Sequence, residues 1–103
     1  MHHRLAHPRS GSIVHLRVGD TLELVLRQPA LQQRWRVTLR PYGVDLLEDS
    51  DEAADRRGRH PHLRRLMFRA MVGAGGILRL EEHRDRVGDV SVEPVDLLLT
   101  VSP

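Results

Sequence analysis

The sequence predicts an all-β fold, an immunoglobulin-like antiparallel β-sandwich of about seven strands. Three observations lead to this prediction. Apolar residues alternate with polar ones in several short runs, residues typical of turns recur roughly every 8–12 positions, and no segment shows a helical period. A chain of 103 residues is long enough for one such domain and no more.

The strands are expected where the period-2 pattern is clearest. Leu22, Leu24 and Leu26 alternate with Glu23, Val25 and Arg27 after the turn signal Gly19-Asp20, which is typical of a strand with one buried face. The same reasoning, applied along the chain, predicts strands over residues 13–18, 22–26, 35–39, 44–47, 66–70, 77–80 and 95–101.

Trp35 opens the third of these strands and is the only tryptophan in the chain. Because the chain has few other large side chains, we expect Trp35 to be buried between the two sheets. The last strand contains the run Leu97-Leu98-Leu99, so we expect it to lie centrally in a sheet and to be covered on both faces.

Four segments lack a strand pattern. Residues 48–62 and 81–89 are charged and are expected to be loops, residues 49–62 being the least ordered internal segment. Gly73-Ala74-Gly75-Gly76 is expected to be a turn between antiparallel strands, because a phosphate-binding glycine loop leads into a helix and this one leads into a strand. Residues 1–11 are expected to be a mobile tail, which leaves residues 12–103 as the domain.

Composition excludes several functional classes. The net charge is only +2, acidic residues are interspersed with the arginines, and aromatic residues make up 3% of the chain, so nucleic acid is not an expected partner. No apolar run reaches the length of about 20 residues needed for a membrane span. The N-terminus lacks the apolar core of a signal peptide, so the expected location is cytoplasmic.

The sequence also argues against catalysis. There is no cysteine, hence no disulfide and no thiol nucleophile, and no serine lies in a nucleophile-elbow pattern. His2, His3 and His7, or His60 and His62, are the candidate metal ligands, but solvated histidines are the expected state of both groups. We therefore expect no enzymatic activity, no metal and no cofactor.

One segment resembles a known family. Residues 28–35 read Gln-Pro-Ala-Leu-Gln-Gln-Arg-Trp and lie between two expected strands. They resemble the Asn-Pro-Thr-Thr-Gly-Tyr-x-Trp loop of the chagasin-type inhibitors of papain-like cysteine peptidases, in which proline and tryptophan have the same spacing. By the order of strands and turns, the resemblance extends over roughly residues 13–101.

The resemblance implies a protein partner, a papain-like cysteine peptidase, which three loops at one end of the sandwich would bind as a wedge. The alternative is a non-inhibitory interaction module on the same scaffold. Carried over to this chain, the three loops supply the expected binding residues, namely Gln28, Pro29, Ala30, Leu31, Gln32 and Gln33 from the first, Gly58, Arg59 and His60 from the second, and Arg84, Asp85 and Arg86 from the third.

Overall fold

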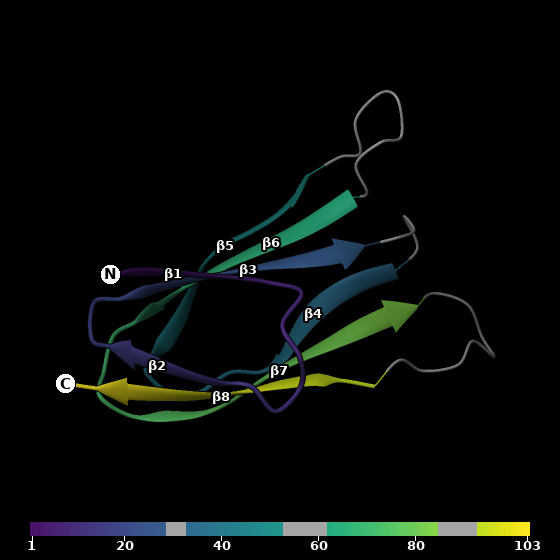
Figure 1. Cartoon of the computed structure of the whole chain (residues 1–103). Helices are drawn as coiled ribbons and strands as arrows, with labels where there is room; N and C mark the ends of the chain where they lie inside the picture. The colour runs from purple at the N-terminus through teal and green to yellow at the C-terminus, as the bar shows by residue number, and fades with distance from the viewer. Residues whose placement is uncertain (29–32, 53–61, 85–92) are drawn as a thin grey trace.

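The computed structural model describes residues 1–28, 33–52, 62–84 and 93–103, and every regular element within these ranges is a β-strand (Figure 1). The strands are β1 (His2–Ala6), β2 (Ile13–Arg17), β3 (Thr21–Gln28), β4 (Gln33–Leu39), β5 (Val44–Glu52), β6 (His62–Ala70), β7 (Gly75–Arg84) and β8 (Val95–Ser102). Within the same ranges, no helix of the length and apolarity needed to cross a membrane is present.

Two four-stranded sheets form the sandwich. Their strand orders are β1-β3-β6-β5 and β2-β8-β7-β4. The prediction of an all-β, immunoglobulin-like sandwich is confirmed, with two differences. The described residues contain eight strands rather than about seven, and each sheet is mixed, because β1 pairs with β3 and β2 pairs with β8 in parallel.

The core is aliphatic and comes from the alternating runs. Phe68 of β6 is the largest fully buried side chain, and the leucines around it are almost completely inaccessible to solvent. Each buried leucine contributes about 1.5–3 kcal/mol through removal of its apolar surface from water. These core leucines are Leu16 of β2, Leu22, Leu24 and Leu26 of β3, Leu66 of β6, Leu78 and Leu80 of β7, and Leu97 and Leu99 of β8.

The N-terminal segment differs from the prediction. Residues 1–11 are not a mobile tail throughout, because residues 2–6 form β1, which extends the sheet beyond β3. Leu5 packs against the core, and the backbone of β3 supplies the hydrogen-bonding edge that β1 requires. The fold therefore begins before residue 12. A segment with one apolar residue facing inward is a poor strand signal in sequence but a good partner for an existing edge.

Several strands are longer than predicted, and three of them extend into the expected charged loops. β5 continues to Glu52 and β7 to Arg84, so residues 48–52 and 81–84 are strand rather than loop. Residue 62, expected at the end of the first charged loop, begins β6. The remainder of both expected loops, residues 53–61 and 85–89, lies outside the described part of the chain, and so does most of the segment expected to be least ordered.

The predicted turns connect the two sheets. Gly19 adopts φ +95° in the turn between β2 of one sheet and β3 of the other, a conformation that favours glycine. The turn predicted at residues 73–76 is correct only in part. Residues 71–74 carry the chain from β6 to the opposite sheet, Gly75 and Gly76 already belong to β7, and β6 and β7 lie in different sheets rather than forming an antiparallel pair. β8 is an inner strand, as predicted. Leu98, however, remains 42% exposed, so only one face of β8 is covered.

Candidate functional site

One end of the sandwich collects the bases of the three segments expected to bind a partner. β3, β5 and β7 finish there, and β4 and β6 begin there (Figure 1). In one sheet Gln28 lies opposite His62, and Glu52 lies opposite Leu63. In the other sheet Gln33 lies opposite Arg84. The topology therefore anchors residues 29–32, 53–61 and 85–92 at strand ends on the same side of the molecule.

Only part of the predicted site is described. The backbones of Gln28, Gln33 and Arg84 are placed at the ends of β3, β4 and β7. The other expected binding residues lie outside the described ranges, so their contribution to binding remains a prediction; they are Pro29, Ala30, Leu31, Gln32, Gly58, Arg59, His60, Asp85 and Arg86.

Trp35 joins the two sheets beside the first of these segments. Its ring is half-buried and packs against the edge of the core, and its Nε1–H donates to the backbone carbonyl of Arg27 at 3.0 Å. Trp35 belongs to β4 and Arg27 to β3, which lie in different sheets. The expectation of a tryptophan packed between the sheets is therefore correct in position, but its burial is incomplete, because the indole lies at the end of the core.

Arg64 fastens β5 to β6 near the second segment. Its side chain is 15% exposed, its Nη1 donates to Asp51 Oδ1 at 2.9 Å, and its Nε lies 2.7 Å from Asp49 Oδ1. The second contact is an ion pair without the alignment of a hydrogen bond. Burial acts to lower the pKa of Arg64, but the hydrogen bond to Asp51 and the charges of both carboxylates outweigh it and raise the pKa.

The cluster of Arg64 with Asp49 and Asp51 was not predicted from the sequence, although the sequence contains a signal for it. Asp49 and Asp51 are two positions apart, so they point to the same face of β5. The cross-strand register places Asp51 directly opposite Arg64. A period-2 pair of carboxylates followed by arginine on the next strand is the polar equivalent of an apolar alternation. Paired in this way, β5 remains a strand up to the base of the second segment.

The next residue, Arg65, belongs to a second polar cluster around Glu23. Glu23 is a largely buried carboxylate on β3. Its Oε2 lies 3.3 Å from Arg65 Nε and 3.7 Å from Arg4 Nε, and its Oε1 lies 3.3 Å from His2 Nε2. The cluster links β1 and β6 to the strand between them, which explains how a polar side chain is tolerated in the middle of the sheet.

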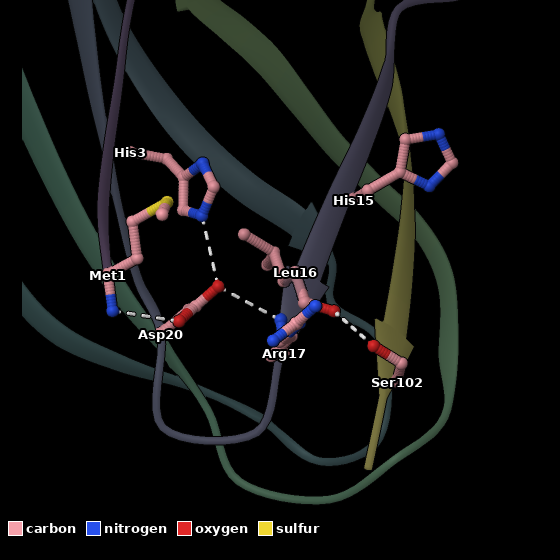
Figure 2. Close-up of a pocket in the computed structure, with 7 residues that line it drawn as sticks. All are labelled: Met1, His3, His15, Leu16, Arg17, Asp20 and Ser102. Carbon is pink, nitrogen blue, oxygen red and sulfur yellow. Dashed lines mark hydrogen bonds and ion pairs between the residues drawn. The ribbon is translucent and has the colours of Figure 1, made fainter.

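A cleft of about 440 Å³ opens between β1 and β2 at the other end of the sandwich (Figure 2). Its polar wall is the carboxylate of Asp20. Oδ2 accepts from the Arg17 backbone N–H at 3.0 Å and lies 3.0 Å from His3 Nε2, and Oδ1 accepts from the Met1 amine at 2.9 Å. These donors, the Arg17 amide first among them, hold the pKa of Asp20 far below its usual range.

The cleft gives no indication of chemistry. The Met1 amine and the His3 ring already pair with Asp20, so the carboxylate secures the start of β1. His2 and His3, two of the candidate metal ligands, contact the different carboxylates Glu23 and Asp20. Within the described ranges, no three histidine or acidic side chains come together as a metal site would require.

Comparison with known proteins identifies the fold. No protein-family profile and no curated protein matches the sequence. Among solved structures, the chain is similar to the cysteine protease inhibitor EhICP2 of Entamoeba histolytica, with a TM-score of 0.77 and 16% identity over 97% of this chain and 94% of that chain. It is also similar to amebosin, solved in solution, with a TM-score of 0.73 and 15% identity over 99% of both chains. The chain therefore shares the fold of a cysteine protease inhibitor along almost its entire length.

Proposed function

We propose that this protein inhibits papain-like cysteine peptidases by inserting one end of its sandwich into the peptidase cleft, without any chemical step. The observation that carries the proposal is the anchoring of residues 29–32, 53–61 and 85–92 at one end of a fold shared with a cysteine protease inhibitor. In this proposal the three segments together supply the contact surface that blocks the cleft.

The composition of the segments favours a protein partner. In this proposal Ala30 and Leu31 form an apolar tip, and the amides of Gln32 and Gln33 flank it as hydrogen-bonding groups. Arg84 supplies a guanidinium group for a carboxylate or a carbonyl of the peptidase. Apolar anchors surrounded by polar groups are the usual arrangement of a protein interface.

The described part of the site supports this mode of binding, because it holds the strand ends firmly. The Trp35–Arg27 hydrogen bond links the two sheets next to the first segment, and Arg64 links β5 to β6 next to the second. Because the strand ends that carry the segments are already ordered, less conformational entropy is lost on binding. A large loss of this kind would reduce the affinity. The tip itself lacks an aromatic anchor, and such anchors are worth about 2 kcal/mol or more. We therefore expect micromolar rather than nanomolar inhibition.

The test is a titration of the protein against papain and a cathepsin-like peptidase, with hydrolysis of a fluorogenic peptide as the readout. Leu31→Asp places a charge at the proposed tip and is expected to weaken inhibition at least tenfold, equivalent to about 1.4 kcal/mol. The matched control is Leu98→Asp, because Leu98 is also a leucine but lies exposed on the outer face of β8. The control is expected to inhibit like the parent.

Two outcomes would contradict the proposal. Absence of inhibition at several hundred micromolar, about the weakest affinity expected of a specific complex, would favour the alternative of a non-inhibitory interaction module. Equal losses with Leu31→Asp and Leu98→Asp would show that inhibition does not depend on the proposed tip. A competition assay at several substrate concentrations adds a further check, since occupation of the cleft must raise the apparent KM without changing kcat.

A further inference from the structure

The end of the sandwich opposite the proposed binding segments carries an exposed apolar patch, made of Val18, Tyr42, Met71 and Val72. These side chains lie on three different turns and are 44%, 82%, 48% and 43% exposed, respectively. Both chain termini lie at the same end (Figure 1). Apolar side chains gathered on neighbouring turns are more informative than single exposed ones, because contiguous patches on small proteins often mark interaction sites.

The three turns that carry the patch are tied together by their backbones. The Gly19 N–H donates to the Ala70 carbonyl at 2.8 Å, and the Met71 N–H donates to the Gly43 carbonyl at 2.7 Å. Gly43 has φ +81°, and a Cβ on it would come within 2.9 Å of Val72 Cβ, so the second and third turns are closely packed. The patch is therefore pre-formed and would lose little entropy on binding.

The patch has both a protrusion and hollows. Tyr42 stands at the rim of a hollow of about 320 Å³, which also contains Asp45 in its wall. A second hollow of about 390 Å³ lies beside it and is lined by Val18, Arg69 and Met71. Met71 separates the two hollows, since it lines both of them. The same surface therefore carries a projecting aromatic side chain and, beside it, a hollow with apolar side chains in its wall that an aromatic side chain can enter.

The charges at this end have both signs. Asp45 of β5 lies opposite Arg69 of β6 in the register, and both side chains are exposed. Neither forms an ion pair with any side chain of the described ranges. Asp45 lines the first hollow together with Arg40, and Arg69 lines the second. A surface with one sign of charge repels its own copy, whereas a surface that carries Asp45 beside these arginines can form ion pairs with a second copy.

We propose that this end of the sandwich is a two-fold interface with a second copy of the chain. Tyr42 of each copy enters the hollow between Val18 and Met71 of the other, and Asp45 of each copy pairs with Arg69 of the other. Such an isologous contact closes after two subunits, because the same residues are used on both sides. The proposed peptidase-binding ends then point away from each other, so that one dimer binds two peptidase molecules.

The size of the patch sets the expected strength. Four apolar side chains with two ion pairs place the interface at the low end of specific contacts, about 1,200 Å² or less in total. We therefore expect a dimer in exchange with its monomer at micromolar concentrations. Sedimentation velocity between about 10 µM and about 1 mM, a range that spans such affinities, is expected to show a shift from monomer to dimer.

Complementary charge reversals provide the decisive test. Asp45→Arg alone and Arg69→Asp alone each place like charges in contact and are expected to leave the chain monomeric. In an equimolar mixture, however, the two substituted side chains meet with opposite charges, and so do the native Arg69 of the first variant and the native Asp45 of the second. The mixture is therefore expected to dimerise. Tyr42→Asp removes the protruding side chain and is expected to be monomeric both alone and in mixtures.

Leu98→Asp serves as the control, because it introduces the same charge at an exposed apolar position outside the patch. It is expected to dimerise like the parent, and thermal melting of every variant verifies that it is folded. A parent chain that stays monomeric up to about 1 mM would overturn the proposal, as would a mixture of the two charge variants that fails to associate. Co-sedimentation of a monomeric parent with phosphatidylserine vesicles, abolished by Tyr42→Asp, would overturn it in favour of a membrane surface.

Discussion

The indole Nε1–H of Trp35 donates to the backbone carbonyl of Arg27 at 3.0 Å, and this hydrogen bond joins strands of opposite sheets. The two sheets otherwise meet mainly through aliphatic side chains, which pack without directional preference. A directional bond at the end of the core fixes β4 relative to β3. The bond lies close to the point where the chain leaves β3 for the first proposed binding segment, residues 29–32, and returns in β4.

Trp35→Phe and Trp35→Ala separate the two contributions of this side chain. Trp35→Phe keeps an aromatic ring on the core but loses the donor, so we expect a loss of about 1 kcal/mol in the free energy of unfolding. Trp35→Ala also loses the packing and is expected to cost about 2–4 kcal/mol, below the range for a fully buried tryptophan. Urea denaturation followed by circular dichroism measures both. A Trp35→Ala variant as stable as the parent would contradict this placement.

Arg64→Met is expected to destabilise the chain by about 1–3 kcal/mol, because it leaves Asp49 and Asp51 without the cation that pairs with both. Hydrogen exchange should accelerate at the paired ends of β5 and β6. The control is Arg79→Met, since Arg79 pairs with the single carboxylate of Asp96 through two hydrogen bonds of 2.8 and 3.1 Å, and its side chain is 41% exposed against 15% for Arg64. A pair made by an arginine this accessible to water contributes about 0–1 kcal/mol. Equal losses would argue against a special role for Arg64.

Asp20→Asn is expected to flatten the acid limb of the stability curve. The pKa of Asp20 is depressed in the folded chain, first by the Arg17 amide and then by the Met1 amine and His3. A depressed carboxylate pKa stabilises the native state above the unfolded pKa of about 3.9, and this stabilisation is lost as the pH falls below it. The free energy of unfolding, measured by urea denaturation between about pH 6 and pH 2, should therefore decrease less steeply with falling pH for Asp20→Asn than for the parent.

Gly75→Ala is expected to be strongly destabilising, by about 2–4 kcal/mol, because two effects combine. Gly75 has φ +156°, and a Cβ on it would overlap the carbonyl oxygen of Leu99 on the paired strand β8. Gly11→Ala separates the two effects, since Gly11 has φ +90° with no atom near the added Cβ. It should cost only about 1 kcal/mol, the value of the backbone strain alone. Thermal melting of both variants compares them, and equal costs would show that the overlap is relieved by a small shift of the strand.

The proposed binding site could be located from the sequence only in outline. The proline and tryptophan of residues 28–35 indicated which segment to consider, and the ends of β3 and β4 agree with it. The partner of Trp35 could not be predicted, because a backbone carbonyl carries no sequence signal. Arg64 could be identified only once β5 and β6 were known to be neighbours, since its two carboxylates come from a different strand.

By itself the sequence determined the β class, the core strands and the main turns. Leu22, Leu24 and Leu26 occupy every second position of a single strand. A pattern of this kind lies within a few consecutive residues, so it can be recognised without knowing which strands are neighbours. Only the tertiary structure decided that residues 2–6 form a strand, that β5 and β7 continue into charged segments, and that two strand pairs are parallel. The physical reason is that a polar strand is stabilised by its neighbours. β1 depends on the edge of β3, and the acidic end of β5 depends on Arg64, which lies on another strand.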